Sequence, residues 1–162
     1  MSVYRLDDEL FDFPPAEEAD DEYDGLLAVG GDYSPERLLN AYSNGIFPWP
    51  VAEGRPITWF SPDPRFVLKA ADFRIPKSLK KTLKKRLFDY RVNTAFAEVI
   101  HECSIVSRPG QDGTWITDDL EKGYCELNQL GFAHSFEAWQ GDKLVGGFYG
   151  VAIGSCFLGE SM

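Results

Sequence analysis

The hydrophobic positions are densest near the end of the chain. Two apolar runs, residues 144–153 and 156–158, flank Gly154-Ser155, a pair typical of a two-residue β-hairpin turn. Five glycines lie in or beside these runs, at positions 146, 147, 150, 154 and 159. Each glycine weakens an ordinary strand, because it adds backbone entropy and removes a packing side chain. We therefore expect this hairpin at the centre of a sheet, with another group approaching its backbone closely.

Helical spacing of apolar residues occurs further upstream. Ser34 is a predicted N-cap, followed by a proline at the first helical position, and Gly45 ends this helix. Asn93 or Thr94 is expected to cap another helix. Its core positions follow the i, i+3, i+4, i+7 pattern and are Phe96, Val99, Ile100 and Cys103. Thr117 is the predicted N-cap of a further helix, which Gly131 stops.

Strand signals complete the fold prediction. Residues 25–32 predict a short buried strand closed by a glycine turn, and residues 133–139 predict a strand that joins the terminal hairpin. Residues 59–65 contain two prolines within three positions, so no regular structure is expected there. We predict an α/β protein of the α+β type, with a small N-terminal domain at 1–62. In residues 63–162 the order of elements favours a mixed α/β sheet over a repeated βαβ wind.

The composition permits a folded core and limits the class of protein. The 162 residues are 44% hydrophobic, enough for one domain or for a small domain plus part of another. No apolar run approaches the roughly 18 residues of a membrane span, and the acidic N-terminus does not resemble a signal peptide. Cys103, Cys125 and Cys156 are widely spaced. Such spacing favours reduced thiols in a cytoplasmic protein over a disulfide framework or a metal site.

The net charge of −10 is concentrated in one segment. Residues 1–24 hold ten acids and one arginine, a net −9, so the remaining residues carry only −1. We interpret the acidic segment as a solvated, partly disordered surface. A polyanionic partner is therefore compatible with the rest of the protein.

One predicted helix, residues 76–87, is strongly basic. At helical spacing Leu79, Leu83 and Leu87 occupy one side. Lysines fill the other side: Lys77, Lys80, Lys81, Lys84 and Lys85. Like charges at i,i+4 cost an isolated helix about 0.2–0.5 kcal/mol per pair. No acid on that face relieves the repulsion, whereas the phosphate backbone of a nucleic acid would relieve it. We therefore favour nucleic-acid contact over an ordinary solvated face.

Few residues indicate chemistry. Glu160 is the only carboxylate expected deep in an aromatic, glycine-rich strand, and a reactive acid and a structural salt bridge are equally compatible with it. Phe47-Pro48-Trp49-Pro50 is interpreted either as a corner plug or as a stacking wall for a base, and Trp115 is a second aromatic candidate. No nucleophile elbow surrounds His134-Ser135, so His134 is expected to be structural.

Eight short motifs occur together in one order along the chain. They are residues 25–32, 34–39, 45–49, 61–65, 113–117, 133–135, 144–147 and 159–162. In this combination the sequence resembles the leucyl/phenylalanyl-tRNA–protein transferases, from about residue 13 to the end. The resemblance implies an aminoacyltransferase that moves Leu or Phe from charged tRNA to proteins beginning with Arg or Lys, marking them for degradation. It also implies that residues 63–162 form part of an acyl-CoA N-acyltransferase-like fold.

The resemblance implies roles for individual residues as well. Trp49 and Trp115 are similar to the aromatic residues that hold the 3′-terminal adenosine, and Phe148 and Phe157 to the walls of the pocket for the transferred side chain. Glu160 is similar to the acidic residue at the reaction centre. The lysines of the basic helix correspond to a cluster that contacts the tRNA acceptor stem. Because the aminoacyl ester is already activated, no cofactor is expected.

Family members continue beyond the Glu-Ser-Met at 160–162 with segments that complete the site. We therefore expect a truncated chain with low or no catalysis alone. The first alternative function is a fragment that only binds aminoacyl-tRNA. An acyl-CoA-dependent N-acyltransferase has less support, because the CoA-binding loop of that fold would lie after residue 162.

Overall fold

The computed structural model describes residues 3–7, 9–49, 54–106 and 114–162. In these residues the first sheet has the order β1–β2–β4–β3, with β1 at Tyr4–Arg5, β2 at Leu26–Val29, β3 at Phe47–Pro48 and β4 at Thr58–Phe60. The second sheet has the order β5–β6–β7–β8, with β5 at Asp89–Val92, β6 at Ala133–Gln140, β7 at Lys143–Ile153 and β8 at Cys156–Ser161. The α-helices are α1 at Pro35–Ser43, α2 at Lys77–Lys84, α3 at Phe96–Ile105 and α4 at Asp118–Gln129. The predicted α+β class is confirmed.

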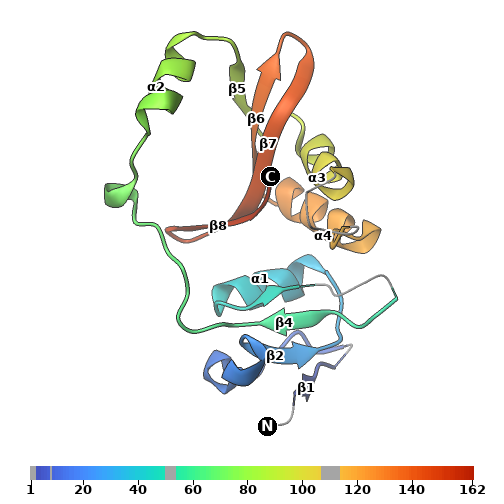
Figure 1. Cartoon of the computed structure of the whole chain (residues 1–162). Helices are drawn as coiled ribbons and strands as arrows, with labels where there is room; N and C mark the ends of the chain where they lie inside the picture. The colour runs from blue at the N-terminus through green and yellow to red at the C-terminus, as the bar shows by residue number, and fades with distance from the viewer. Residues whose placement is uncertain (1–2, 8, 50–53, 107–113) are drawn as a thin grey trace.

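The second sheet has a covered face and an open face. Burial along β6 alternates residue by residue from Ala133 to Gln140, as expected for a strand with one side in the core. Helices α3 and α4 pack against the covered face (Figure 1). The described pairings in this sheet are antiparallel, whereas β1 and β2 pair in parallel.

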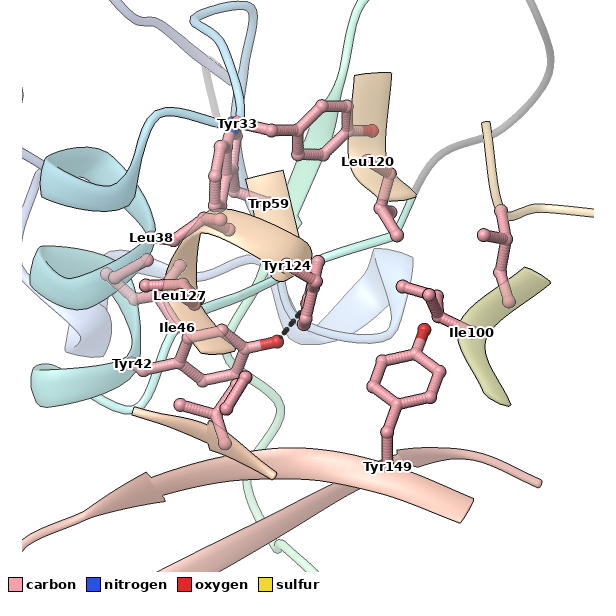
Figure 2. Close-up of a cluster of buried hydrophobic side chains, with 14 of the residues drawn as sticks. Tyr33, Leu38, Tyr42, Ile46, Trp59, Ile100, Leu120, Tyr124, Leu127 and Tyr149 are labelled. Carbon is pink, nitrogen blue, oxygen red and sulfur yellow. Dashed lines mark hydrogen bonds between the residues drawn. The ribbon is translucent and has the colours of Figure 1, made fainter. Parts of the chain in front are cut away.

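One hydrophobic core connects the two sheets. Helix α4 lies between them and packs against α1 on one side and α3 on the other (Figure 1). Figure 2 shows large buried side chains from both parts of the chain in this region, among them Leu38, Tyr42, Ile46, Leu120, Tyr124 and Leu127. The relative position of the sheets is therefore fixed by apolar packing as well as by the covalent connection.

The closest approach at this junction involves Gly123, in the middle of α4. A β-carbon at this position would lie 2.3 Å from the carbonyl oxygen of Tyr33, which is a backbone atom. Glycine in a helix interior is less favourable than alanine by about 1 kcal/mol. Gly123 therefore serves the contact with the loop after β2 rather than the stability of its own helix.

The N-terminus of α3 corrects one prediction. Asn93 and Thr94 do not cap this helix with their side chains. Instead, Oε1 of Glu137 accepts hydrogen bonds from the backbone N–H groups of Thr94 and Ala95, both at 2.9 Å. Glu137 comes from β6, more than forty positions away in the sequence. A local pattern could not indicate this cap, because its acceptor arrives through the tertiary fold.

Glu137 is a second deeply placed carboxylate, on a strand without glycine, and the sequence did not single it out. Only 3% of Glu137 is exposed. Burial by itself would raise the pKa of its carboxyl group, but the hydrogen bonds, led by that from Thr94, outweigh burial and lower the pKa to about 2. Because this pKa lies below the ordinary value of 4.5, the carboxylate stabilises the fold above about pH 4.5. That contribution is lost as the pH falls through about 2.

The prediction that residues 59–65 lack regular structure is wrong for the first two. Trp59 and Phe60 belong to β4, which pairs with both β2 and β3, and Trp59 is completely buried. Strand β5 was not indicated by the sequence, because only its pairing with β6 distinguishes it from a polar loop.

Two further expectations are corrected: Ser34 precedes α1 but its side chain makes no capping hydrogen bond, and the terminal hairpin lies at the edge of the described sheet, with β8 last, rather than at its centre. The predictions for two helix starts and one turn are confirmed. Pro35 begins α1, and the Thr117 hydroxyl caps α4 by accepting from the Leu120 N–H at 3.3 Å. The pair Gly154-Ser155 forms the turn between β7 and β8. Across the described part of the chain, no helix combines the length and the apolar character needed to cross a membrane.

Replacing Gly123 with alanine should destabilise the protein, although alanine is the better helix former. The added β-carbon would collide with the Tyr33 carbonyl, and overpacking of this kind costs about 1–3 kcal/mol of unfolding free energy. Gly146→Ala is the matched control, since a β-carbon there meets no atom within 4 Å. Urea unfolding measures both variants against the wild type. Equal midpoints for Gly123→Ala and the wild type would contradict the close approach.

Candidate functional site

Glu160 lies where β8, α1 and α4 meet. The hydroxyl of Tyr42, on α1, donates to Oε1 of Glu160 at 2.7 Å, and the hydroxyl of Tyr124, on α4, lies 3.4 Å from Oε2. The two tyrosine hydroxyls are also hydrogen-bonded to each other, as Figure 2 shows. Both tyrosines are buried. We call these three residues the Glu160 cluster; it joins side chains up to 118 positions apart.

Burial controls the protonation of the Glu160 cluster. It raises the pKa of Glu160 to about 7, against the opposing effects of the two tyrosine hydrogen bonds and of the Arg65 charge. Burial and then the Glu160 charge raise the pKa values of Tyr42 and Tyr124 well above their ordinary value. No ion pair of Glu160 is found among the described residues, so the structural salt bridge, one of the two interpretations of this residue, is not supported. At neutral pH the Glu160 carboxyl group can therefore either accept or donate a proton.

Three phenylalanine rings form an apolar surface on the open face of the second sheet. The rings of Phe136 and Phe148 stack, with centroids 4.9 Å apart and an interplanar angle of 13°. Phe157 presents its ring edge-on to both, at 5.5 and 6.1 Å. Each ring remains between 37% and 43% exposed. This aromatic trio offers a partly formed apolar surface against which a further side chain can pack.

The aromatic trio explains one of the glycines in β7. A β-carbon on Gly150 would lie 2.6 Å from the ring of Phe157 and 2.2 Å from the backbone oxygen of Leu158. Phe157 can therefore lie across β7 only because position 150 carries no side chain. This contact matches the expectation that another group approaches the hairpin backbone closely.

The aromatic trio and the Glu160 cluster lie on opposite faces of the sheet. Phe136 and Phe148 alternate along their strands with the buried Ser135 and Tyr149, so they belong to the open face. Glu160 sits at an irregularity in the pairing of β7 with β8, and its carboxylate points towards α1 and α4. A substrate that contacts both groups must pass over β8, the last strand of the described sheet.

Trp49 lies directly after β3 and is 57% exposed. Its ring packs against those of Phe47 and Phe60, at centroid distances of 6.2 Å. This exposure argues against the corner-plug interpretation, and Trp59 is the buried tryptophan of this corner instead. Pro50, from the same motif, lies outside the described residues.

Trp115 lies just before α4 and packs, partly buried, against the core. Gly113, from its motif, is outside the described residues. Among the described rings, Trp115 is not in contact with Trp49 or with the aromatic trio. The structure thus brings Phe148 and Phe157 together but does not join the two tryptophans directly, and a common adenosine site stays a prediction.

The predicted basic helix corresponds to α2 and stands away from the second sheet (Figure 1). Every residue of α2 is exposed, including Leu79 and Leu83 of its apolar side. No ion pair involves its lysines within the described residues. The face of Lys77, Lys80, Lys81, Lys84 and Lys85 is thus accessible, and its contact with RNA stays a prediction.

The remaining candidate groups do not form a site. His134 is hydrogen-bonded through Nδ1 to the side-chain nitrogen of Asn93 at 2.9 Å, consistent with a structural role. Within the described ranges, no three His, Cys, Asp or Glu side chains come together in a way that could hold a metal ion.

Comparisons with known proteins identify the family. Residues 67–162 match the family described as leucyl/phenylalanyl-tRNA protein transferase, and residues 31–63 match the N-terminal domain of the same family. The chain belongs to the leucyl/phenylalanyl-tRNA–protein transferase family.

Several relatives carry the name leucyl/phenylalanyl-tRNA–protein transferase. That of Myxococcus xanthus is 53% identical over 100% of this chain and 68% of its own length. That of Nitratidesulfovibrio vulgaris is 51% identical over 100% of this chain and 68% of its own length. That of Xanthomonas oryzae is 55% identical over 93% of this chain and 60% of its own length. The chain therefore spans between 60% and 68% of the length of these three relatives.

Three residues of the candidate transferase site were not indicated by the sequence. Neither Tyr42 nor Tyr124 was singled out as a site residue. Phe136 lies within a correctly predicted strand, but its contact with Phe148 depends on the register of β6 against β7. The alternation of residues 133–139 could have placed Phe136 on the side of the strand that faces solvent. An exposed aromatic residue at such a position is a signal for binding.

Tyr42→Phe should raise the pKa of Glu160 above its wild-type value of about 7, because the variant loses a donor that favours the ionised carboxylate. The fold favours the protonated form of Glu160, so this group stabilises the protein fully below about pH 4.5. The contribution is lost as the pH rises through about 7. Carboxyl ¹³C NMR measures the titration midpoint, with Tyr90→Phe at an exposed position of β5 as the control. A midpoint that stays or falls would contradict the assigned hydrogen bond.

Proposed function

We propose that the protein transfers leucine or phenylalanine from charged tRNA to acceptor proteins whose N-terminal residue is arginine or lysine, and thereby marks them for degradation. The observation that carries this proposal is the Glu160 carboxyl group, held by Tyr42 and Tyr124 beside a strand that also presents exposed aromatic rings. Membership in the transferase family supports the type of reaction. Because charged tRNA is the donor, we place the reaction in the cytoplasm.

The reaction requires a neutral amine next to an activated ester. The α-amino nitrogen of the acceptor attacks the ester carbonyl carbon and forms a C–N bond. The bond between that carbon and the 3′-terminal adenosine oxygen then breaks, and a proton from the amine replaces it on the released hydroxyl group. Holding the two reactants in contact can lower the barrier by several kcal/mol, or about 7–11 in the best intramolecular cases.

Glu160 is suited to act on the acceptor in this reaction. Its pKa of about 7 means that part of the Glu160 population is ionised at physiological pH, and this carboxylate can accept a hydrogen bond from the incoming amine or take up a proton from its ammonium form. The same carboxylate could pair with the cationic side chain of the acceptor residue. Both roles need a negative charge that is shielded from water, and Tyr42 and Tyr124 hold it in one orientation.

The aromatic trio is proposed to receive the transferred side chain. Phe148 and Phe157 form two walls and Phe136 supplies a third, so a leucine or phenylalanine side chain would pack on aromatic surface on more than one side. Trp49 and Trp115 are proposed to hold the 3′-terminal adenosine by stacking, an interaction that any base can make.

The exposed lysines of α2 also support a second candidate function, in which the chain binds charged tRNA and transfers nothing. A transfer assay with radiolabelled Phe-tRNA and an Arg-terminated peptide separates the two functions. Labelled peptide supports transfer, whereas retention of Phe-tRNA on the protein without labelled peptide supports binding alone.

Glu160→Gln should lower the rate of transfer by about 100-fold, because the amide can neither take up a proton nor carry the negative charge. Its affinity for Phe-tRNA should change little, since the donor contacts remain. Single-turnover transfer and filter binding measure the two quantities separately. Glu102→Gln, at an exposed position of α3, is the control. If the variant transfers at the same rate as the wild type, Glu160 has no role in the reaction.

The triple substitution of Lys80, Lys81 and Lys84 by alanine should weaken tRNA binding and flatten its dependence on salt. Each lost phosphate contact is expected to reduce the slope of log K against log salt by about 1. Filter binding at several salt concentrations measures this slope. Lys143→Ala, at an exposed position of β7, is the control for a general loss of positive charge. An unchanged slope in the triple variant would indicate that α2 is an ordinary solvated helix that does not contact tRNA.

A further inference from the structure

Arg65 makes two contacts with the corner between α1 and β3. It lies in the irregular segment after β4, and its Nη1 donates a hydrogen bond to the carbonyl oxygen of Gly45. Its guanidinium carbon lies 4.8 Å from the centroid of the Phe47 ring. A planar guanidinium can combine a directed hydrogen bond with stacking on an aromatic face, which a lysine ammonium cannot do in the same geometry.

The first contact reaches the helix that carries Tyr42. Gly45 follows the end of α1 with φ of +75°, and its N–H donates to the carbonyl oxygen of Tyr42 at 3.2 Å. The carbonyl groups at a helix C-terminus carry a partial negative charge and attract cations. Arg65 is thus the cation at the end of α1, one turn from the tyrosine that donates to Glu160.

The second contact reaches the tryptophan proposed to stack on adenosine. The Phe47 ring, under the Arg65 guanidinium, lies 6.2 Å from the ring of Trp49. Phe60 lies at the same distance from both of these rings. Displacement of Phe47 would therefore change the surface on which Trp49 rests.

We propose that Arg65 is a positioning residue that holds the Tyr42 end of α1 and the rings of Phe47 and Trp49 in one fixed arrangement. The Glu160 cluster and the Trp49 ring, which is proposed to stack on adenosine, thereby remain aligned. This inference rests on the proposed function, because the identity of the ligand that this arrangement would bind comes from it. Arg65 touches no reacting atom. Its effect passes through Tyr42 on one side and through Phe47 on the other.

The charge of Arg65 also acts on the Glu160 cluster. Burial raises the pKa of Glu160, and the Arg65 charge counteracts part of that rise. The other groups that act on Glu160 are Tyr42 from α1 and Tyr124 from α4, with the Tyr149 hydroxyl group of β7 acting in turn on Tyr124. Among the described residues Arg65 is the cation that acts on this carboxyl group, so its removal has a measurable signature at Glu160.

The experiment compares three variants of the full chain. Arg65→Gln removes both the charge and the stacking guanidinium, Arg65→Lys keeps the charge but loses the planar stack, and Arg74→Gln is the control. Arg74 is an exposed arginine of the same segment, and its hydrogen bonds stay within that segment, to Ala71 and Phe73. The readouts are the titration midpoint of Glu160 by carboxyl ¹³C NMR and the indole ¹H–¹⁵N resonance of Trp49.

Arg65→Gln should move the Glu160 midpoint to higher pH and shift the Trp49 indole resonance. Arg65→Lys should leave the Glu160 midpoint near its wild-type value but shift the Trp49 resonance, and Arg74→Gln should change neither. Binding of 3′-deoxy-3′-(L-phenylalanylamido)adenosine, followed by calorimetry, should weaken about tenfold in Arg65→Gln, because weakening the stack of one base on an aromatic ring has an effect of this order on affinity.

If Arg65→Gln leaves both the Glu160 midpoint and the Trp49 resonance at the values of the control, the proposal is overturned. A loss of stability without a change in either readout overturns it as well, because it shows a purely structural arginine. If Arg65→Gln does not fold, an unshifted Trp49 resonance in Arg65→Lys has the same consequence. Wild-type protein that does not bind the adenosine analogue contradicts the proposed function alone, since neither NMR readout depends on that ligand.

Discussion

The hydrogen bonds from Tyr42 and Tyr124 to Glu160 hold together the part of the molecule on which the proposed chemistry depends. One tyrosine belongs to the helix of the N-terminal sheet, the other to the helix between the two sheets, and the carboxylate to the last strand. The position of a single carboxyl group is therefore determined by three elements that meet only in the folded chain. Because the tyrosines are buried in the common core, the carboxylate is fixed by the same packing that fixes the two sheets.

Glu137 and Glu160 show how one residue type acquires opposite properties within one sheet. Both carboxyl groups are removed from water, which by itself raises a pKa. Glu137 accepts enough hydrogen bonds, including two from backbone N–H groups at the start of α3, to lower its pKa to about 2. Among the described residues Glu160 accepts from two hydroxyl groups only, and burial prevails, so its pKa rises to about 7. The first carboxylate is suited to structure and the second to proton transfer.

The arrangement of the second sheet limits how a substrate can bind. The aromatic trio lies on the open face, and the Glu160 carboxylate points towards the covered face. Each group includes a residue of β8, Phe157 on the open face and Glu160 on the other. In the proposed reaction the aminoacyl ester therefore lies across this strand, with its side chain on one face and its carbonyl group near the other. The glycines of β7 belong to this arrangement, since Gly150 provides the space that the Phe157 ring occupies.

The sequence by itself determined the features that depend on neighbouring residues. Helix starts at Pro35 and Thr117, the turn at Gly154-Ser155 and the core positions of α3 follow from capping, turn chemistry and hydrophobic spacing, all of which act within a few residues. The motifs also indicated the family and Glu160 as a candidate acid. Strands β1 and β5 lacked such a signal, because short polar strands are defined by the partner beside them.

Only the tertiary structure decided the surroundings of each candidate residue. The cap of α3 by Glu137, the tyrosine partners of Glu160 and the stacking of Phe136 on Phe148 connect residues that are far apart in sequence. The tertiary structure also decided that Trp49 is exposed and Trp59 is buried. The two tryptophans lie in similar aromatic motifs, so the sequence did not distinguish them. A pKa or an exposed ring depends on every group that packs around it. Those groups are brought together by strand register and helix packing, which no single stretch of sequence specifies.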